Sequence, residues 1–149
     1  MVELSPEVAA FVGAQRTARF ATVDVRGRPH VVPICFACEA GRVYSVLDAK
    51  PKRVPVRDLR RVRNLLANPH VQLLFDRYDE DWSRLAYVQL RGVASLVETP
   101  SAQQRHAVAL LRSRYAQYTT MDIDEAPVIL VTIEAVVSWG DLRVEATPG

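Results

Sequence analysis

The side chains in this sequence that could do chemistry are basic and lie close together. Between positions 50 and 63 there are seven lysines and arginines and a single acid, Asp58, so this basic segment carries a net charge of +6. The rest of the chain carries −4, which leaves the whole chain at +2. Forked guanidinium donors suit phosphate or carboxylate. The segment therefore predicts a local anion site, built from Lys50, Lys52, Arg53, Arg57, Arg60, Arg61 and Arg63.

Two other interpretations of the basic segment compete with an anion site. It could be a solvated basic face, and composition alone leaves that alternative open. It could also bind nucleic acid, but nucleic-acid binders interleave aromatic side chains with the basic ones or keep the whole domain basic. No aromatic residue lies between positions 50 and 63, and the remainder of the chain is acidic. We therefore expect no nucleic-acid partner.

Other catalytic and metal-binding patterns are missing from the sequence. It has no glycine-rich dinucleotide or P-loop motif and no nucleophile elbow. Its histidines are scattered singly, at His30, His70 and His106, and we expect them to pack or to face solvent. Cys35 and Cys38 form a C-x-x-C pair, but in a run of strand-forming residues, and no second ligand pair completes a zinc site. We predict two packed cysteines, no metal and no catalytic triad.

Periodicity predicts six strands and three helices around these side chains. Ser5-Pro6 and Thr99-Pro100 are typical helix starts, with a capping hydroxyl followed by proline. Hairpin turns join the first strands, so we expect an antiparallel meander of the first three and a mainly β, six-stranded antiparallel sheet, closed or nearly closed into a barrel. The expected helices are 5–14, 57–67 and 99–115, and the expected strands are 19–25, 29–36, 42–47, 70–76, 85–97 and 127–138.

Length and composition favour one domain over residues 1–149. We expect no membrane span and no secretory signal, because no apolar run is long enough, so a cytoplasmic protein is predicted. In this arrangement a strand ending at Ser45–Leu47 leads into the basic segment and then into a helix near Arg57. Helix N-termini favour anions, so the unit resembles a socket for the phosphate of a cofactor.

Two motifs resemble one known family. The run from Ala21 to Ile34 is similar to the first-hairpin signature of the flavin-reductase-like split β-barrels, which include pyridoxamine 5′-phosphate oxidase and the deazaflavin (F420)-dependent reductases. The run 44–47, then Lys52, 60–65 and 68–71, is similar to the cofactor-phosphate segment of the same family. The resemblance covers about residues 15–140.

The resemblance implies an FMN-binding split barrel that forms a homodimer with two cofactor sites at the interface. The cofactor ring would lie along the strand that carries Val31–Ile34, and the phosphate would meet a serine and basic residues. Trp82 is expected either to cover the cofactor of the neighbouring subunit or to pack, and Trp139 to lie near the substrate. By position, the implied cofactor-binding residues are Val32, Pro33, Ile34, Ser45, Val46, Lys50, Lys52, Arg57, Arg60, Arg61, Asn64 and Trp82.

The implied activity is hydride transfer between F420 and a small organic substrate. The basic segment suits the polyanionic tail of F420 better than the single phosphate of FMN, but an FMN-dependent oxidoreductase of the same fold is an alternative. A non-catalytic cofactor or haem carrier and a nucleic-acid-binding module are further alternatives. A proton could come from solvent or from a side chain such as Tyr87 or Tyr44, and the substrate is not identified.

Overall fold

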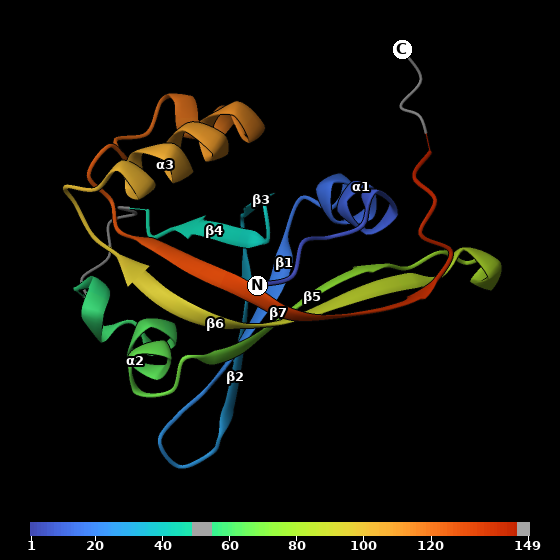
Figure 1. Ribbon diagram of the computed structural model, residues 1–149, viewed down its shortest axis with the longest axis horizontal. Helices are drawn as coiled ribbons and strands as arrows, with labels where there is room; N and C mark the ends of the chain where they lie inside the picture. The colour runs from blue at the N-terminus through green and yellow to red at the C-terminus, as the bar shows by residue number, and fades with distance from the viewer. Residues whose placement is uncertain (49–54, 146–149) are drawn as a thin grey trace.

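The computed structural model describes residues 1–48 and 55–145 (Figure 1). Three α-helices and three short 3-10 helices accompany seven strands in the described residues. The order is α1 (Pro6–Ala14), β1 (Ala18–Val23), β2 (Pro29–Ile34), β3 (Ala37–Glu39), β4 (Arg42–Val46), η1 (Val56–Asp58), α2 (Arg60–Ala67), β5 (His70–Arg77), η2 (Trp82–Arg84), β6 (Ala86–Val97), α3 (Ala102–Arg114), η3 (Ala116–Thr119) and β7 (Val128–Gly140).

All seven strands belong to one antiparallel sheet with the order β2-β1-β5-β6-β7-β4-β3. β2 and β3 therefore lie at opposite edges of the sheet, although only Cys35 and Phe36 separate them in the chain. Three peptide steps span at most roughly 10 Å, so the two edges must meet at this link. The sheet consequently curls into a barrel that is open along one seam. This confirms the prediction of a mainly β fold with a nearly closed antiparallel sheet.

Two details of the predicted sheet were wrong. The expected strand 29–36 ends at Ile34 as β2, and a short strand that was not predicted, β3, follows it, which makes seven strands instead of six. The expected meander of the first three strands also fails, because β4 pairs with β7 and β3 and not with β2. The physical reason is Phe36, whose side chain enters the core and carries the chain from one edge of the sheet to the other.

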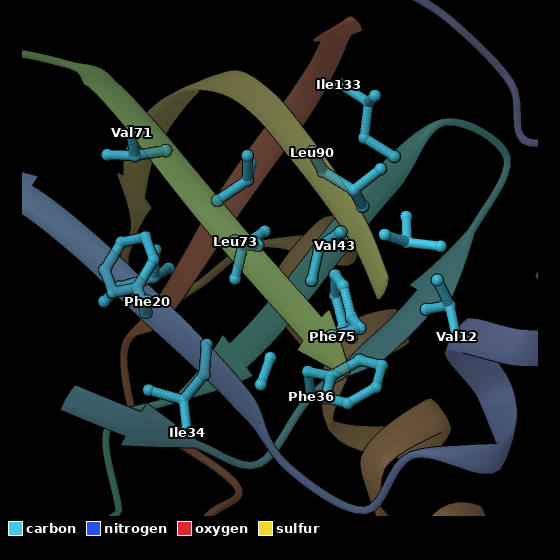
Figure 2. Packing of buried hydrophobic residues seen from close by; sticks show 14 of the residues in the cluster. Val12, Phe20, Ile34, Phe36, Val43, Val71, Leu73, Phe75, Leu90 and Ile133 are labelled. Carbon is cyan, nitrogen blue, oxygen red and sulfur yellow. The ribbon is translucent and has the colours of Figure 1, made fainter. Parts of the chain in front are cut away.

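The inside of the curl is filled by the larger of two hydrophobic clusters. Figure 2 shows Phe20 from β1, Leu73 and Phe75 from β5 and Leu90 from β6 in one cluster with Phe36. The Phe36 and Phe75 rings meet edge to face, with centroids 5.0 Å apart. Full burial of such side chains stabilises the fold by about 1.5–3 kcal/mol each. The core thus holds the curl that brings the sheet edges together.

The helices pack against the sheet in different places: α1 and α2 contribute side chains to the cluster inside the curl, and α3 contributes side chains to the second cluster. α3 packs over β3 and β4 and buries the second cluster, which includes Tyr44, Val108 and Leu111. α2 packs against β1 and β6, and in Figure 1 it lies on the side of the sheet away from α3. α3 begins later than predicted, after a cap by Ser101, whose hydroxyl accepts from the Gln104 N–H. No helix in the described part of the chain is long and apolar enough to cross a membrane.

The link between β2 and β3 is held from α3 as well as from the core. The backbone N–H of Phe36 donates to the Tyr115 hydroxyl at 3.1 Å, and that hydroxyl donates to the carbonyl of Arg16 at 2.8 Å. The Arg114 guanidinium lies over the Phe36 ring, 4.6 Å from its centroid. These contacts place the end of β2 and the start of β3 relative to α3.

Gly92 lies inside the long strand β6 and allows a β-bulge there, which bends the strand. The register between β6 and β7 shifts between Arg91 and Gly92. A Cβ atom on Gly92 would lie 2.4 Å from the Thr132 carbonyl oxygen and 2.6 Å from Val131 Cγ1. Glycine is therefore required at position 92 because the β6 backbone approaches β7 too closely for a side chain.

We predict that Gly92→Ala lowers the free energy of unfolding by about 1–3 kcal/mol, because the added methyl group forces β6 and β7 apart. The matched control is Gly13→Ala in α1, where a Cβ atom meets nothing within 4 Å. This control should gain about 0.5–1 kcal/mol from reduced backbone entropy. Urea unfolding curves of both variants test the prediction, and equal stability of Gly92→Ala and wild type would contradict it.

Candidate functional site

A pocket opens at the seam of the sheet, where the end of β2 approaches β4. Its volume is about 260 Å³. β2 and the link after it contribute Pro33, Ile34 and Cys35, and α2 contributes Arg61. The fold thus brings five of the predicted cofactor residues to one pocket: Pro33, Ile34, Ser45, Val46 and Arg61. The remaining lining residues are Thr17, Cys35, Asp48 and Tyr118. We call this the seam pocket.

Arg61 is the charged group that distinguishes the seam pocket. Its Nε is buried and has no hydrogen-bond partner among the described residues. Burial lowers the pKa of the Arg61 guanidinium, and the nearby Asp48 carboxylate opposes that shift. Buried N–H donors are nearly always paired in native proteins. An unpaired one at a pocket therefore indicates a place for an acceptor oxygen of a ligand.

Most of the other polar groups at the pocket suit the same kind of ligand, and the Asp48 carboxylate is the exception. Ser45 lies on β4 and is only 7% exposed. Leu59 precedes α2 and supplies no side-chain cap to the first turn, which contains Arg61. Within the described part of the chain β2 is an edge strand, so alternate backbone groups along it have no partner strand. The pocket combines a cation, a hydroxyl and a strand edge with one carboxylate.

Tyr118 and Cys35 line the pocket but were not predicted as site residues. Tyr118 lies in η3, and no sequence motif marks it as a site residue. Burial, with a smaller contribution from Cys35 and Asp48, raises the pKa of the Tyr118 phenol. The phenol therefore stays protonated and can donate a hydrogen bond. Only the three-dimensional fold brings Tyr118 to Ser45.

The predicted basic residues do not all converge on the seam pocket. Arg60 lines a second, larger hollow of about 660 Å³ between the β1–β2 hairpin and α2, together with Arg63 and Asn64. Arg57 forms an exposed ion pair with Glu98, with 2.7 Å between Nη2 and Oε1. The predicted ligands Lys50 and Lys52 lie outside the described residues. We call the larger space the hairpin hollow.

Asn64 already has one defined contact. Its side-chain amide donates to the Thr22 hydroxyl at 2.9 Å, and both residues are buried. This bond ties α2 to β1 and so positions the helix turn that carries Arg60 and Arg61. Asn64 also lines the hairpin hollow.

The remaining predicted residues lie elsewhere. Val32 packs against the core, and Trp82 is 71% exposed in η2, away from the seam pocket. Tyr87 stacks on Trp139 with ring centroids 5.8 Å apart, and Tyr44 is buried beside α3. Neither tyrosine suggested as a proton source lines the seam pocket.

The two cysteines are free and form no disulfide with each other. Cys38 lies in β3, where burial raises the pKa of its thiol to about 11. Cys35 lies in the link and lines the seam pocket. Within residues 1–48 and 55–145 no cluster of histidines, cysteines and acids could hold a metal ion.

Comparison with known families decides how this geometry is classified. The family model described as pyridoxamine 5′-phosphate oxidase matches residues 4–140. The chain belongs to the pyridoxamine 5′-phosphate oxidase family. The match covers the seam pocket, the hairpin hollow and every strand that frames them. No curated protein matches the chain.

Several solved structures have the same fold as this chain, although their sequences are only distantly similar to it. A conserved hypothetical protein from Mycobacterium tuberculosis is 22% identical with a TM-score of 0.75, over 100% of this chain and 94% of that chain. HutZ, the haem storage protein from Vibrio cholerae, is 21% identical with a TM-score of 0.69, over 91% of this chain and 94% of that one. A haem-binding protein from Mycobacterium smegmatis is 19% identical with a TM-score of 0.69, over 94% of this chain and 56% of that one.

We predict that Thr22→Val lowers the free energy of unfolding by about 1–3 kcal/mol, because it leaves the buried Asn64 amide without its acceptor. The control is Thr120→Val, which removes an exposed hydroxyl and should change stability by less than about 0.5 kcal/mol. Thermal unfolding of both variants measures the difference. Equal melting temperatures for the two variants would show that the Asn64–Thr22 bond does not secure α2.

Proposed function

We propose that this protein is an oxidoreductase that binds the deazaflavin F420 in the seam pocket and acts on a small organic substrate. FMN is the alternative cofactor in the same pocket. The observation that carries the proposal is the unpaired, buried Nε of Arg61 in a pocket shared with Ser45. Family membership supplies the class of cofactor, and the pocket supplies the anion-binding groups.

The donors at the seam pocket fit a cofactor phosphate. Arg61 offers a charged N–H that lacks an acceptor, Ser45 offers a hydroxyl, and the first turn of α2 offers backbone N–H groups. Charge-assisted hydrogen bonds of this kind are about twice as strong as neutral ones. Pro33 and Ile34 form an apolar wall beside these donors. We infer that the phosphate lies against Arg61 and that the ring extends along the open edge of β2.

The distribution of the other arginines supports F420 over FMN. Arg60 and Arg63 line the hairpin hollow, on a different side of α2 from the seam pocket. FMN carries one phosphate, which the seam pocket alone can bind. F420 carries a further anionic tail, for which the hairpin hollow offers Arg60 and Arg63, although Asp24 and Asp58 also line it. Lys50 and Lys52 remain predicted contacts for this tail.

When bound, the cofactor supplies the hydride-carrying centre of the reaction. The chain supplies orientation and a protonated donor. Tyr118 holds its proton over the whole physiological range, because burial raises the pKa of its phenol. We infer that Tyr118, rather than Tyr44 or Tyr87, donates a hydrogen bond to the ligand at the seam pocket.

We also propose that the protein works as a homodimer. Large apolar side chains are exposed on β2, in η2 and on β7: Val31 is 62%, Trp82 71% and Trp139 52% exposed. β2 is in addition an open sheet edge. A second copy that covers this edge would shield Val31 and close the site over the seam pocket.

Haem binding has weaker support in this chain. Haem iron needs an axial ligand such as histidine or a cysteine thiolate. The described lining of the seam pocket contains no histidine; Cys35 and Tyr118 are the residues there that could ligate haem iron, and burial favours the protonated form of Tyr118 by raising its pKa. His106 is engaged by the Glu39 carboxylate at 2.8 Å and lies on α3. We therefore do not propose a haem site.

The central prediction concerns Arg61. Arg61→Ala should weaken F420 binding by about 10- to 100-fold, because it removes a charge-assisted contact. Arg105→Ala, which removes the same charge from an exposed position on α3, should leave binding within about threefold of wild type. Isothermal titration calorimetry with F420 and with FMN measures both variants. Unchanged affinity of Arg61→Ala would remove Arg61 from the site, and failure of wild type to bind either cofactor at micromolar concentration would refute the proposed function.

The choice of cofactor has its own test. The double variant Arg60→Ala/Arg63→Ala should weaken F420 binding at least about tenfold and FMN binding much less, because only F420 has a tail to reach the hairpin hollow. The same calorimetric titrations supply the comparison. An equal loss for both cofactors would contradict the assignment of the hairpin hollow to the tail.

The dimer is tested by size-exclusion chromatography with multi-angle light scattering. Wild type should have twice the mass of one chain, and Val31→Glu should shift it toward one chain, because a charge then enters the interface. Val144→Glu, at an exposed position outside the sheet, is the control and should remain dimeric. A wild-type mass of one chain would refute the dimer.

A further inference from the structure

His30 has no role in the function proposed so far, yet its surroundings are unusual. It lies in β2 directly opposite Thr22 in the β1–β2 ladder. Residues directly opposite each other in an antiparallel pair place their side chains on the same side of the sheet. Thr22 faces α2, because its hydroxyl accepts from Asn64. The His30 side chain is therefore also directed toward α2.

The α2 residues that His30 meets are arginines. Arg60 and Arg61 precede Asn64 by four and three positions, so each is a neighbour of Asn64 on the helix surface, one on either side of it. Burial, followed by the charges of Arg60 and Arg61, lowers the pKa of His30 below its usual value. The charged groups that act on His30 are these two arginines, while its β1 neighbour Thr22 is uncharged. A ring in this position is neutral when no anion is near.

Two buried nitrogens in this region lack partners. His30 Nδ1 and Arg61 Nε are both buried and form no hydrogen bond with any described residue. Arg61 belongs to α2, which the Asn64–Thr22 bond joins to β1, and His30 belongs to β2, which pairs with β1. Buried nitrogens without partners are rare in native proteins, and a shared acceptor would satisfy both. An anionic oxygen is the acceptor that also balances the charges of Arg60 and Arg61.

We propose that His30 and Arg61 together bind one anionic group of the ligand, a phosphate or a carboxylate, and that His30 gains a proton when this group binds. The inference rests on the proposed function for the identity of the ligand, because the group would belong to the cofactor. Arg61 lines the seam pocket and Arg60 lines the hairpin hollow, and the charges of both act on His30, which itself lines neither space. His30 is thus placed to hold an anionic group between the two sites.

The sign of the expected pH effect follows from the charges. In the free protein His30 is neutral at pH 7, since burial and two cations lower its pKa. A bound anion offsets the cations and raises that pKa, so binding takes up a proton. Affinity for an anion of constant charge should therefore increase as the pH falls from about 8 to about 6.

The test uses NMR signals of the histidine rings in wild type and in His30→Gln, which identifies the His30 signal by its loss. On saturation with F420 or FMN, the His30 signal should move and its titration midpoint should rise. The His70 and His106 signals, from the start of β5 and from α3, should stay in place. His30→Gln should bind the cofactor about tenfold more weakly, because a charged donor is lost. An unmoved His30 signal in saturated protein would overturn the inference and leave the proposed function intact.

Inorganic sulfate, whose charge is constant between about pH 6 and 8, separates this inference from the proposed function. If neither cofactor binds wild type, the proposed function fails, but sulfate must still move the His30 signal. Sulfate affinity should rise toward low pH in wild type and lose that slope in His30→Gln. The same slope in both proteins, or no response of His30 to sulfate, would overturn the inference.

Discussion

The short link between β2 and β3 is the constraint on which the rest of the molecule depends. Two residues join strands that lie at opposite edges of a seven-stranded sheet, so the sheet can form only if it curls until its edges meet. Phe36 secures the link by burying its ring against Phe75 and by donating its backbone N–H to Tyr115. The seam pocket lies at this junction, so the interaction that closes the fold also creates the site.

The charge of the basic segment is divided by the fold and not concentrated in one socket. Arg61 points to the seam pocket, Arg60 and Arg63 line the hairpin hollow, and Arg57 pairs with Glu98. Arg60, Arg61 and Arg63 lie on the eight-residue helix α2. They reach different spaces because neighbouring positions on a helix face different directions. A ligand with a single phosphate would use only part of this surface. This asymmetry is the physical basis for proposing a cofactor with a longer anionic tail.

Much of the fold could be predicted from sequence because its signals are local. Alternating apolar residues and turn residues located all the long strands, and Ser5-Pro6 located α1. The break between β2 and β3 at Cys35 and Phe36 could not be predicted, since the burial of Phe36 depends on residues distant in the chain. For the site, the resemblance named Ser45 and Arg61, which the fold brings together. Tyr118 and the partnerless nitrogen of His30 carry no sequence signal, because their roles arise from contacts between distant elements.

A crystal structure of the protein with F420 bound would show whether the cofactor phosphate lies in the seam pocket. We predict that a phosphate oxygen lies about 3 Å from Arg61 Nε and from the Ser45 hydroxyl, a normal hydrogen-bonding distance. We also predict that the ring lies along β2 and that the tail extends toward Arg60 and Arg63. A phosphate bound elsewhere, with Arg61 Nε still without a partner, would refute the proposed site.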